Sequence, residues 1–179
     1  LNRLNIQTGV VDVVCDVPGN EYGGTWNDDG VILLASAATD GILRVPASGG
    51  TPTAVTTVDK SRGERTHLFP EFLPDGRHFI YTASTGVCCP AAKPAKIRVA
   101  SLDSAEPAVT LFEVESAVTY ASGHLLFVRN DTLMAQPFDT RKLEMSGEAV
   151  PIAGTEGLND SNAPRFSASM TGALAYRSG

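Results

Sequence analysis

Four similar units follow one another along the 179-residue chain and constrain its fold more than any other feature. Each unit has a glycine followed by a short apolar run, and successive glycines lie 46, 47 and 49 residues apart. An aromatic residue lies a few positions before each glycine. The glycines are Gly30, Gly76, Gly123 and Gly172, and the aromatic residues are Trp26, Phe72, Tyr120 and Phe166. A period of this length is typical of folds in which one small unit is repeated.

Each unit is predicted to contain four strands, and the fourth strand of the first unit is predicted at residues 53–58. The apolar runs are short, rich in β-branched and aromatic residues, and bounded by Gly, Pro and Asp. The turns between them, such as residues 28–30 and 74–76, contain residues that favour turns or positive φ. No stretch of ten or more residues has a helical period. The sequence therefore predicts an all-β fold, a β-propeller of four-stranded antiparallel blades.

The two ends of the chain are predicted to be halves of one blade. Residues 1–19 contain strands three and four, residues 161–179 contain strands one and two, and complete blades cover residues 20–64, 65–115 and 116–160. Residues 1–179 then form a single propeller domain with four blades. The divided blade closes either within one chain or between two chains, as an eight-bladed twofold dimer. Because unpaired strand edges favour association and a ring of four blades is tight, we expect a homodimer.

Composition and charge limit the partners. Hydrophobic residues make up 42% of the chain and charged residues 19%, which is typical of a soluble globular domain. The net charge of −6, without clustered Lys and Arg, argues against nucleic acid. No apolar run approaches the roughly 20 residues of a membrane helix, so we expect no membrane insertion. The odd number of three cysteines does not indicate a set of disulfide bonds. The sequence is therefore compatible with a protein of the cytoplasm and with one of the periplasm or another extracytoplasmic space.

Four segments carry a resemblance to a known family: residues 41–50 (GILRVPASGG), 72–79 (FLPDGRHF), 133–139 (LMAQPFD) and 174–179 (LAYRSG). They resemble TolB-like, WD-type propeller repeats, above all the propeller region that follows the kinase domain in bacterial eukaryotic-like serine/threonine kinases. The resemblance implies a sensor or interaction module that binds a protein or small molecule. Kinase activity is not implied, because the sequence has no G-x-G-x-x-G loop, no HRD motif and no DFG motif.

One set of equivalent positions predicts a metal site. Glu21, His67 and Glu115 each lie five residues before the aromatic residue of their unit, and the same offset in the fourth unit falls next to Asp160. In propellers the first strands line the central channel, so these positions are expected to converge. A set of carboxylates alone is typical of a calcium site. The additional histidine is also compatible with a zinc or manganese site. The alternative to a metal site is that the carboxylates are only hydrated and that His67 forms a hydrogen bond with a backbone carbonyl.

Other residues with reactive side chains carry weaker signals. His78 and His124 open second strands, where we expect packed histidines. Cys88 and Cys89 lie in a long loop with no identifiable base, so we expect ordinary loop cysteines. No G-x-S-x-G motif is present, and no catalytic residue is assigned.

Three hypotheses for function remain open, and with them the question of whether the chain is an enzyme. The first is a ligand- or protein-binding module that uses the channel mouth. The second is a promiscuous hydrolase of esters, lactones or phosphotriesters that depends on a divalent metal in the channel. The third is a structural fragment that only assembles with the rest of a longer parent.

Overall fold

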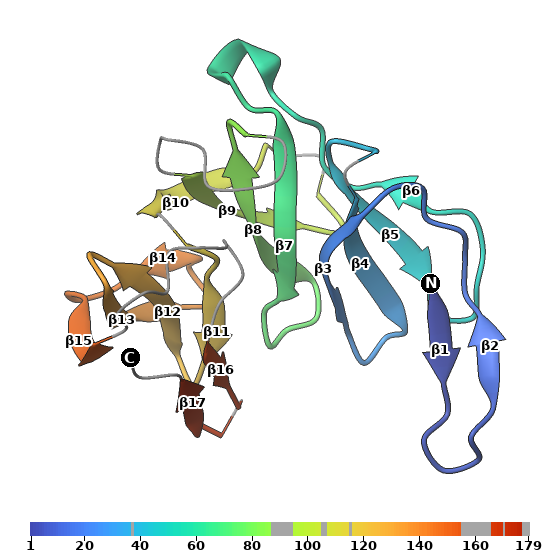
Figure 1. The fold of residues 1–179 in the computed structure, drawn as a ribbon. Coiled ribbons are helices and arrows are strands. Elements are labelled where there is room, and N and C mark those ends of the chain that lie inside the picture. Colours follow the sequence, from blue (N-terminus) through green and yellow to red (C-terminus); the bar gives the residue numbers. More distant parts are fainter. Residues whose placement is uncertain are drawn as a thin grey trace.

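The computed structural model describes residues 1–36, 38–86, 95–104, 107–114, 116–154, 166–169 and 171–176, and these form strands joined by turns (Figure 1). Three antiparallel sheets follow one another along the chain. The first contains β3 (Glu21–Trp26), β4 (Val31–Ser36), β5 (Ile42–Pro46) and β6 (Thr53–Ala54). The second contains β7 (Thr66–Phe72), β8 (His78–Ser84), β9 (Ala95–Ser101) and β10 (Val109–Val114). The third contains β11 (Thr119–Ala121), β12 (His124–Arg129), β13 (Thr132–Asp139), β14 (Glu144–Met145) and β15 (Val150–Gly154), with β14 and β15 both paired to β13.

Two-stranded sheets flank these three. At the N-terminal end β1 (Asn2–Leu4) pairs with β2 (Val11–Val13), and at the C-terminal end β16 (Phe166–Ala168) pairs with β17 (Leu174–Tyr176). The single helical element of the described residues is the 3-10 helix η1 (Lys60–Arg62) between the first and second sheets. None of the helical structure described here is long and apolar enough to cross a membrane.

The sheets stack side by side, with their first strands β3, β7, β11 and β16 towards the inside of an open arc and their last strands fanning outwards (Figure 1). Alternating strand residues fill the spaces between neighbours. Leu33 and Phe79 share one buried cluster between the first and second sheets, and Ile80 and Phe127 share another between the second and third. Burial of each such side chain contributes roughly 1.5–3 kcal/mol. Each sheet can therefore bury both faces only against a neighbour.

A repeated hydrogen bond also joins neighbouring first strands. The backbone N–H of Phe72 donates to Thr25 Oγ1 over 3.3 Å, and the N–H of Tyr120 donates to Glu71 Oε1 over 2.7 Å. Donor and acceptor occupy the same positions in successive units. Together with the stacked faces, this bond fixes how one sheet follows the next.

These observations confirm an all-β fold of four-stranded antiparallel sheets, as the sequence predicts. Closure into a ring is not observed, because β1–β2 and β16–β17 are separate sheets that do not pair among the described residues. The predicted fourth strand of the first unit, residues 53–58, is shorter, since β6 ends at Ala54. His78 and His124 are not packed between sheets: both are partly exposed and bond Asp75 and the Ser122 carbonyl, respectively.

Candidate functional site

The loop between the first and second sheets is tightly structured. Asp59 caps η1, its Oδ1 accepting the N–H of Ser61, and Gly63 ends the helix with a φ of 75°. This left-handed conformation favours glycine and turns the chain back on itself. Glu64 is thereby placed beside the start of the loop, where its Oε2 accepts the Asp59 N–H over 3.0 Å. The loop thus presents a carboxylate to the first residues of β7.

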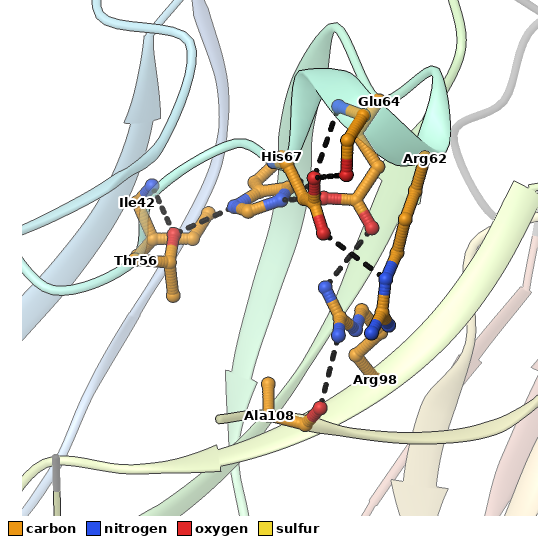
Figure 2. A network of polar contacts seen from close by, with 9 residues as sticks. Ile42, Thr56, Arg62, Glu64, His67, Arg98 and Ala108 are labelled. Atoms are coloured by element: carbon orange, nitrogen blue, oxygen red, sulfur yellow. Dashed lines mark hydrogen bonds and ion pairs between the residues drawn. The ribbon is translucent and has the colours of Figure 1, made fainter. Parts of the chain in front are cut away.

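His67, on β7, lies at the centre of a polar network (Figure 2). Its Nδ1 is 2.7 Å from Thr56 Oγ1, and its Nε2 is 3.2 Å from Glu64 Oε2. The side chain is buried, with 1% of the residue exposed, and its ring lies 4.7 Å from that of Tyr81, measured between centroids. Both ring nitrogens therefore have side-chain partners from the loop.

Arg98, on β9, holds the other side of Glu64. Its Nη1 donates to Glu64 Oε1 over 2.9 Å, and its Nη2 donates to the carbonyl of Ala108 over 3.0 Å (Figure 2). Both members of this ion pair are buried. Loss of one partner from such a pair typically costs about 3–5 kcal/mol, because the other charge stays buried and uncompensated. The arginine therefore fixes the position of Glu64.

The protonation states follow from these contacts. Burial acts to raise the pKa of Glu64, but the Asp59 N–H, His67 and Arg98 together lower it below its ordinary value. Burial lowers the pKa of His67 despite the opposing effect of Glu64. At neutral pH an ionised Glu64 accepts a hydrogen bond from His67 Nε2–H, which leaves Nδ1 free of a proton to accept from the Thr56 hydroxyl.

Thr56 is held from two further directions. The Ile42 N–H donates to its Oγ1 over 2.9 Å, so the hydroxyl oxygen accepts one bond and donates another (Figure 2). Gly41 passes so close that a Cβ there would lie 2.3 Å from the Thr56 carbonyl oxygen. Thr56 is half-buried, in contrast to His67. A hydroxyl, a neutral imidazole and a carboxylate are thus hydrogen-bonded in series.

A surface cleft lies beside this network. It measures about 640 Å³ and is lined by Asp40, Lys60, Gly63, Glu64 and Arg65. The Asp40 carbonyl accepts the N–H of His67 over 2.7 Å, which ties the cleft wall to β7. Two cationic and two anionic side chains surround the opening. Of the series Thr56–His67–Glu64, only Glu64 lines this cleft.

The structure describes two of the four residues that the sequence predicts as a metal site. Glu21 is exposed on β3, His67 is buried with both nitrogens occupied, and Glu115 and Asp160 lie outside the described residues. Within the described ranges no group of three or more His, Cys, Asp or Glu side chains could hold a metal ion. The four-residue set therefore stays a prediction. Cys88 and Cys89 also lie outside the described residues.

Thr56, Glu64 and Arg98 were not singled out by the sequence. Glu64 lies three residues before His67, a spacing that allows contact across a turn, and this is the one local signal. Arg98 comes from a strand of the second sheet, and Thr56 occupies a position that reads as part of a strand. Only the stacking of the two sheets joins them.

The comparisons with known proteins show the fold. No protein-family model matches the chain, and no curated protein matches its sequence. Among solved structures it is similar to a calcium-binding protein, regucalcin, from Agrobacterium tumefaciens, with 16% identity and a TM-score of 0.65 over 97% of this chain and 58% of that one. It is also similar to a luciferin-regenerating enzyme, with 11% identity and a TM-score of 0.59 over 88% of this chain and 54% of that one.

These similarities show that the stacked sheets resemble part of a six-bladed β-propeller. The chain spans a little more than half the length of each of the two proteins. At such identities the likeness concerns the fold alone. The resemblance to TolB-like and kinase-associated propellers stays a prediction from the sequence.

Proposed function

We propose that this chain is part of a propeller that hydrolyses small esters or lactones, with Thr56 as the nucleophile. The observation that carries the proposal is the series Thr56–His67–Glu64, joined by contacts of 2.7 and 3.2 Å. A hydroxyl bonded to a neutral imidazole, which a carboxylate orients in turn, is the arrangement of nucleophilic hydrolases. Fold-level support comes from the similarity to a luciferin-regenerating enzyme.

The chemistry follows from the atoms present. Thr56 Oγ1 attacks the carbonyl carbon of the substrate while its proton passes to His67 Nδ1. The tetrahedral intermediate collapses, His67 returns that proton to the leaving alkoxide oxygen, and an acyl ester remains on Thr56. A water molecule, deprotonated by His67, then attacks the acyl group. This second tetrahedral intermediate collapses, His67 returns the proton to Thr56 Oγ1, and the carboxylic acid is released.

The neighbouring residues support these steps. Ionised Glu64 stabilises the imidazolium that forms on His67 during each transfer. The Ile42 N–H donates to Thr56 Oγ1 and fixes the orientation of the hydroxyl towards His67. Arg98 positions Glu64 through the pair at 2.9 Å. Phosphotriesters are a second substrate class that the same nucleophile can attack.

The dependence of hydrolysis on divalent metals is tested in the assay. Similarity to a calcium-binding protein is the reason to test them.

Steady-state hydrolysis tests the proposal. Purified protein is assayed at pH 7.5 with 4-nitrophenyl acetate, a γ-lactone and a phosphotriester, each with calcium, manganese, zinc or a chelator. Thr56→Val removes the hydroxyl and is expected to lower kcat/KM by about 100-fold or more. Thr56→Ser should retain activity, and the exposed neighbour Thr57→Val is the matched control, expected to match the parent.

Two outcomes would contradict the proposal. Activity that survives Thr56→Val with the parent rate would remove Thr56 as nucleophile. A parent protein inert to the whole panel would leave the ligand- or protein-binding module, which the sequence resemblance supports, as the better assignment.

A further inference from the structure

Three charged side chains at the cleft beside η1 have no partner in the described part of the chain. Lys60 begins η1, Arg65 directly precedes β7, and Asp40 lies in the turn between β4 and β5; all three line the cleft. Each residue is exposed, and none of the three side chains forms a hydrogen bond or an ion pair with another described residue. The neighbouring Arg62 differs, because its Nε lies 3.0 Å from Asp59 Oδ2. The cleft therefore contains two cations and one anion that are available to a ligand.

Glu64, the fourth charged residue of the lining, adds no available charge. Its side chain is 4% exposed, its Oε2 accepts the Asp59 N–H over 3.0 Å, and its Oε1 lies 2.9 Å from Arg98 Nη1. Arg98 is itself buried and does not line the cleft, so it neutralises this carboxylate from inside the protein. The available charge of the cleft is therefore that of two cations and one anion.

The two cations belong to well-anchored backbone. The Arg65 N–H donates to the Ser84 carbonyl at the end of β8 over 2.8 Å, and the Lys60 carbonyl accepts the Gly63 N–H over 3.1 Å. When the backbone of a site is already ordered, a ligand has to immobilise only side chains, which lowers the entropic cost of binding. Both cations are therefore presented to one cleft by a preformed loop.

Asp40 has an unusual backbone conformation. Its φ is 60°, in the left-handed region, and its carbonyl accepts the His67 N–H over 2.7 Å. Aspartate tolerates this region mainly because its short side chain can bond to nearby backbone, but the Asp40 carboxylate makes no such bond. Residues held in strained conformations by the surrounding structure are frequent at ligand sites. The strain at Asp40 is therefore a second observation that points to this cleft.

We propose that the cleft binds an acidic amino acid, a small molecule with two carboxylates and one ammonium group. Arg65 holds one carboxylate through its planar pair of N–H donors, Lys60 pairs with the other, and Asp40 accepts the ammonium group. The charges of such a ligand are the exact complement of the three available side chains. The volume of about 640 Å³ is typical of small-molecule sites. Neither Thr56 nor His67 lines the cleft, so this binding is independent of the proposed hydrolysis.

Isothermal titration calorimetry at pH 7.5 and low salt tests the proposal with four probes. L-Glutamate carries all three groups, glutarate lacks the ammonium group, 4-aminobutyrate lacks one carboxylate, and inorganic phosphate is a simple anion. Glutamate is expected to bind about tenfold or more tightly than each of the other three. Absence of glutamate binding at millimolar concentration would overturn the proposal. Equal binding of glutarate or phosphate would also overturn it, because the cleft would then be an unselective anion site.

Matched variants assign the contacts. Lys60→Gln and Arg65→Gln should each weaken glutamate binding about tenfold. Asp40→Asn keeps a residue that tolerates positive φ and should abolish the preference for glutamate over glutarate. Arg44→Gln, at an exposed arginine of β5 outside the cleft, is the control and should bind glutamate like the parent. Far-ultraviolet circular dichroism checks that the variants fold, and parental affinity in Arg65→Gln would contradict the proposal.

Discussion

Glu71 is a carboxyl at a position where the preceding unit has a threonine. Thr25 and Glu71 both accept a backbone N–H from the next first strand, so a hydroxyl is sufficient for the bond. Burial raises the pKa of Glu71 to about 7, although the Tyr120 N–H and the Thr119 side chain act to lower it. The carboxyl is therefore partly protonated at neutral pH.

This pKa predicts a pH-dependent stability. The folded protein retains the Glu71 proton to about pH 7, whereas the unfolded chain loses it near the ordinary value of 4.5. The stabilisation is fully present below about pH 4.5 and is lost as pH rises through 7, by roughly 3 kcal/mol in the free energy of unfolding. Glu71→Gln should remove this decline, as measured by urea unfolding between pH 4.5 and 8.

The exposed Glu113 on β10 supplies the control for this measurement. Glu113→Gln should follow the parental pH curve. If Glu71→Gln showed the same decline as the parent, the raised pKa would be wrong.

Prediction from sequence was least complete at the scale of single side chains. The sequence indicates His67 as a metal ligand because its position recurs in each unit. A recurring position does not reveal which side chains lie beside it in the folded protein. Its actual partners depend on the η1 loop and on Arg98 from another strand. Buried polar groups must find partners, and those partners are set by tertiary packing. The sequence therefore identified a position of interest without its chemistry.

At the scale of elements, the loop after β6 depends on one close approach. Gly41 lies against the Thr56 backbone, and a Cβ there would be 2.3 Å from the Thr56 carbonyl oxygen. Ile42 follows directly and holds the Thr56 hydroxyl. Position 41 therefore needs a residue without a side chain.

Gly41→Ala is expected to displace the Thr56 loop. The clash should lower the free energy of unfolding by about 1–3 kcal/mol, and the displaced hydroxyl should lower ester hydrolysis. Gly154→Ala is the matched control, because a Cβ there meets nothing within 4 Å, and its effect should stay below about 0.5 kcal/mol. Equal stability and equal activity of the two variants would contradict the assigned role of Gly41.

Most strands could be predicted because each carries its own local signal. Residues 31–35 and 124–128 are alternating or continuous apolar runs after a turn glycine, and β4 and β12 form there. β6 is the exception. Its predicted extension to residue 58 contains β-branched residues that suit a strand, but the side chain of Thr56 bonds Ile42 and His67 in place of a strand partner. Local propensity was overridden by tertiary contacts.

At the scale of the whole molecule, the period of the glycines predicted the stacked sheets, and the fold similarity agrees with propeller architecture. The sequence predicts that the two ends are halves of one blade, and whether these halves meet depends on contacts outside any single unit. Repeat architectures share this property, because each unit is completed only by the next.

Trapping of the acyl intermediate tests the central claim most directly. The protein is incubated at pH 7.5 with a slowly released activated ester, quenched in acid and analysed by intact and peptide mass spectrometry. A single acyl group should appear on Thr56, and it should be absent from Thr56→Val and from His67→Ala that retains its fold. Acylation spread over lysines, or a parent protein without any adduct on Thr56, would contradict the claim that this network forms a reactive centre.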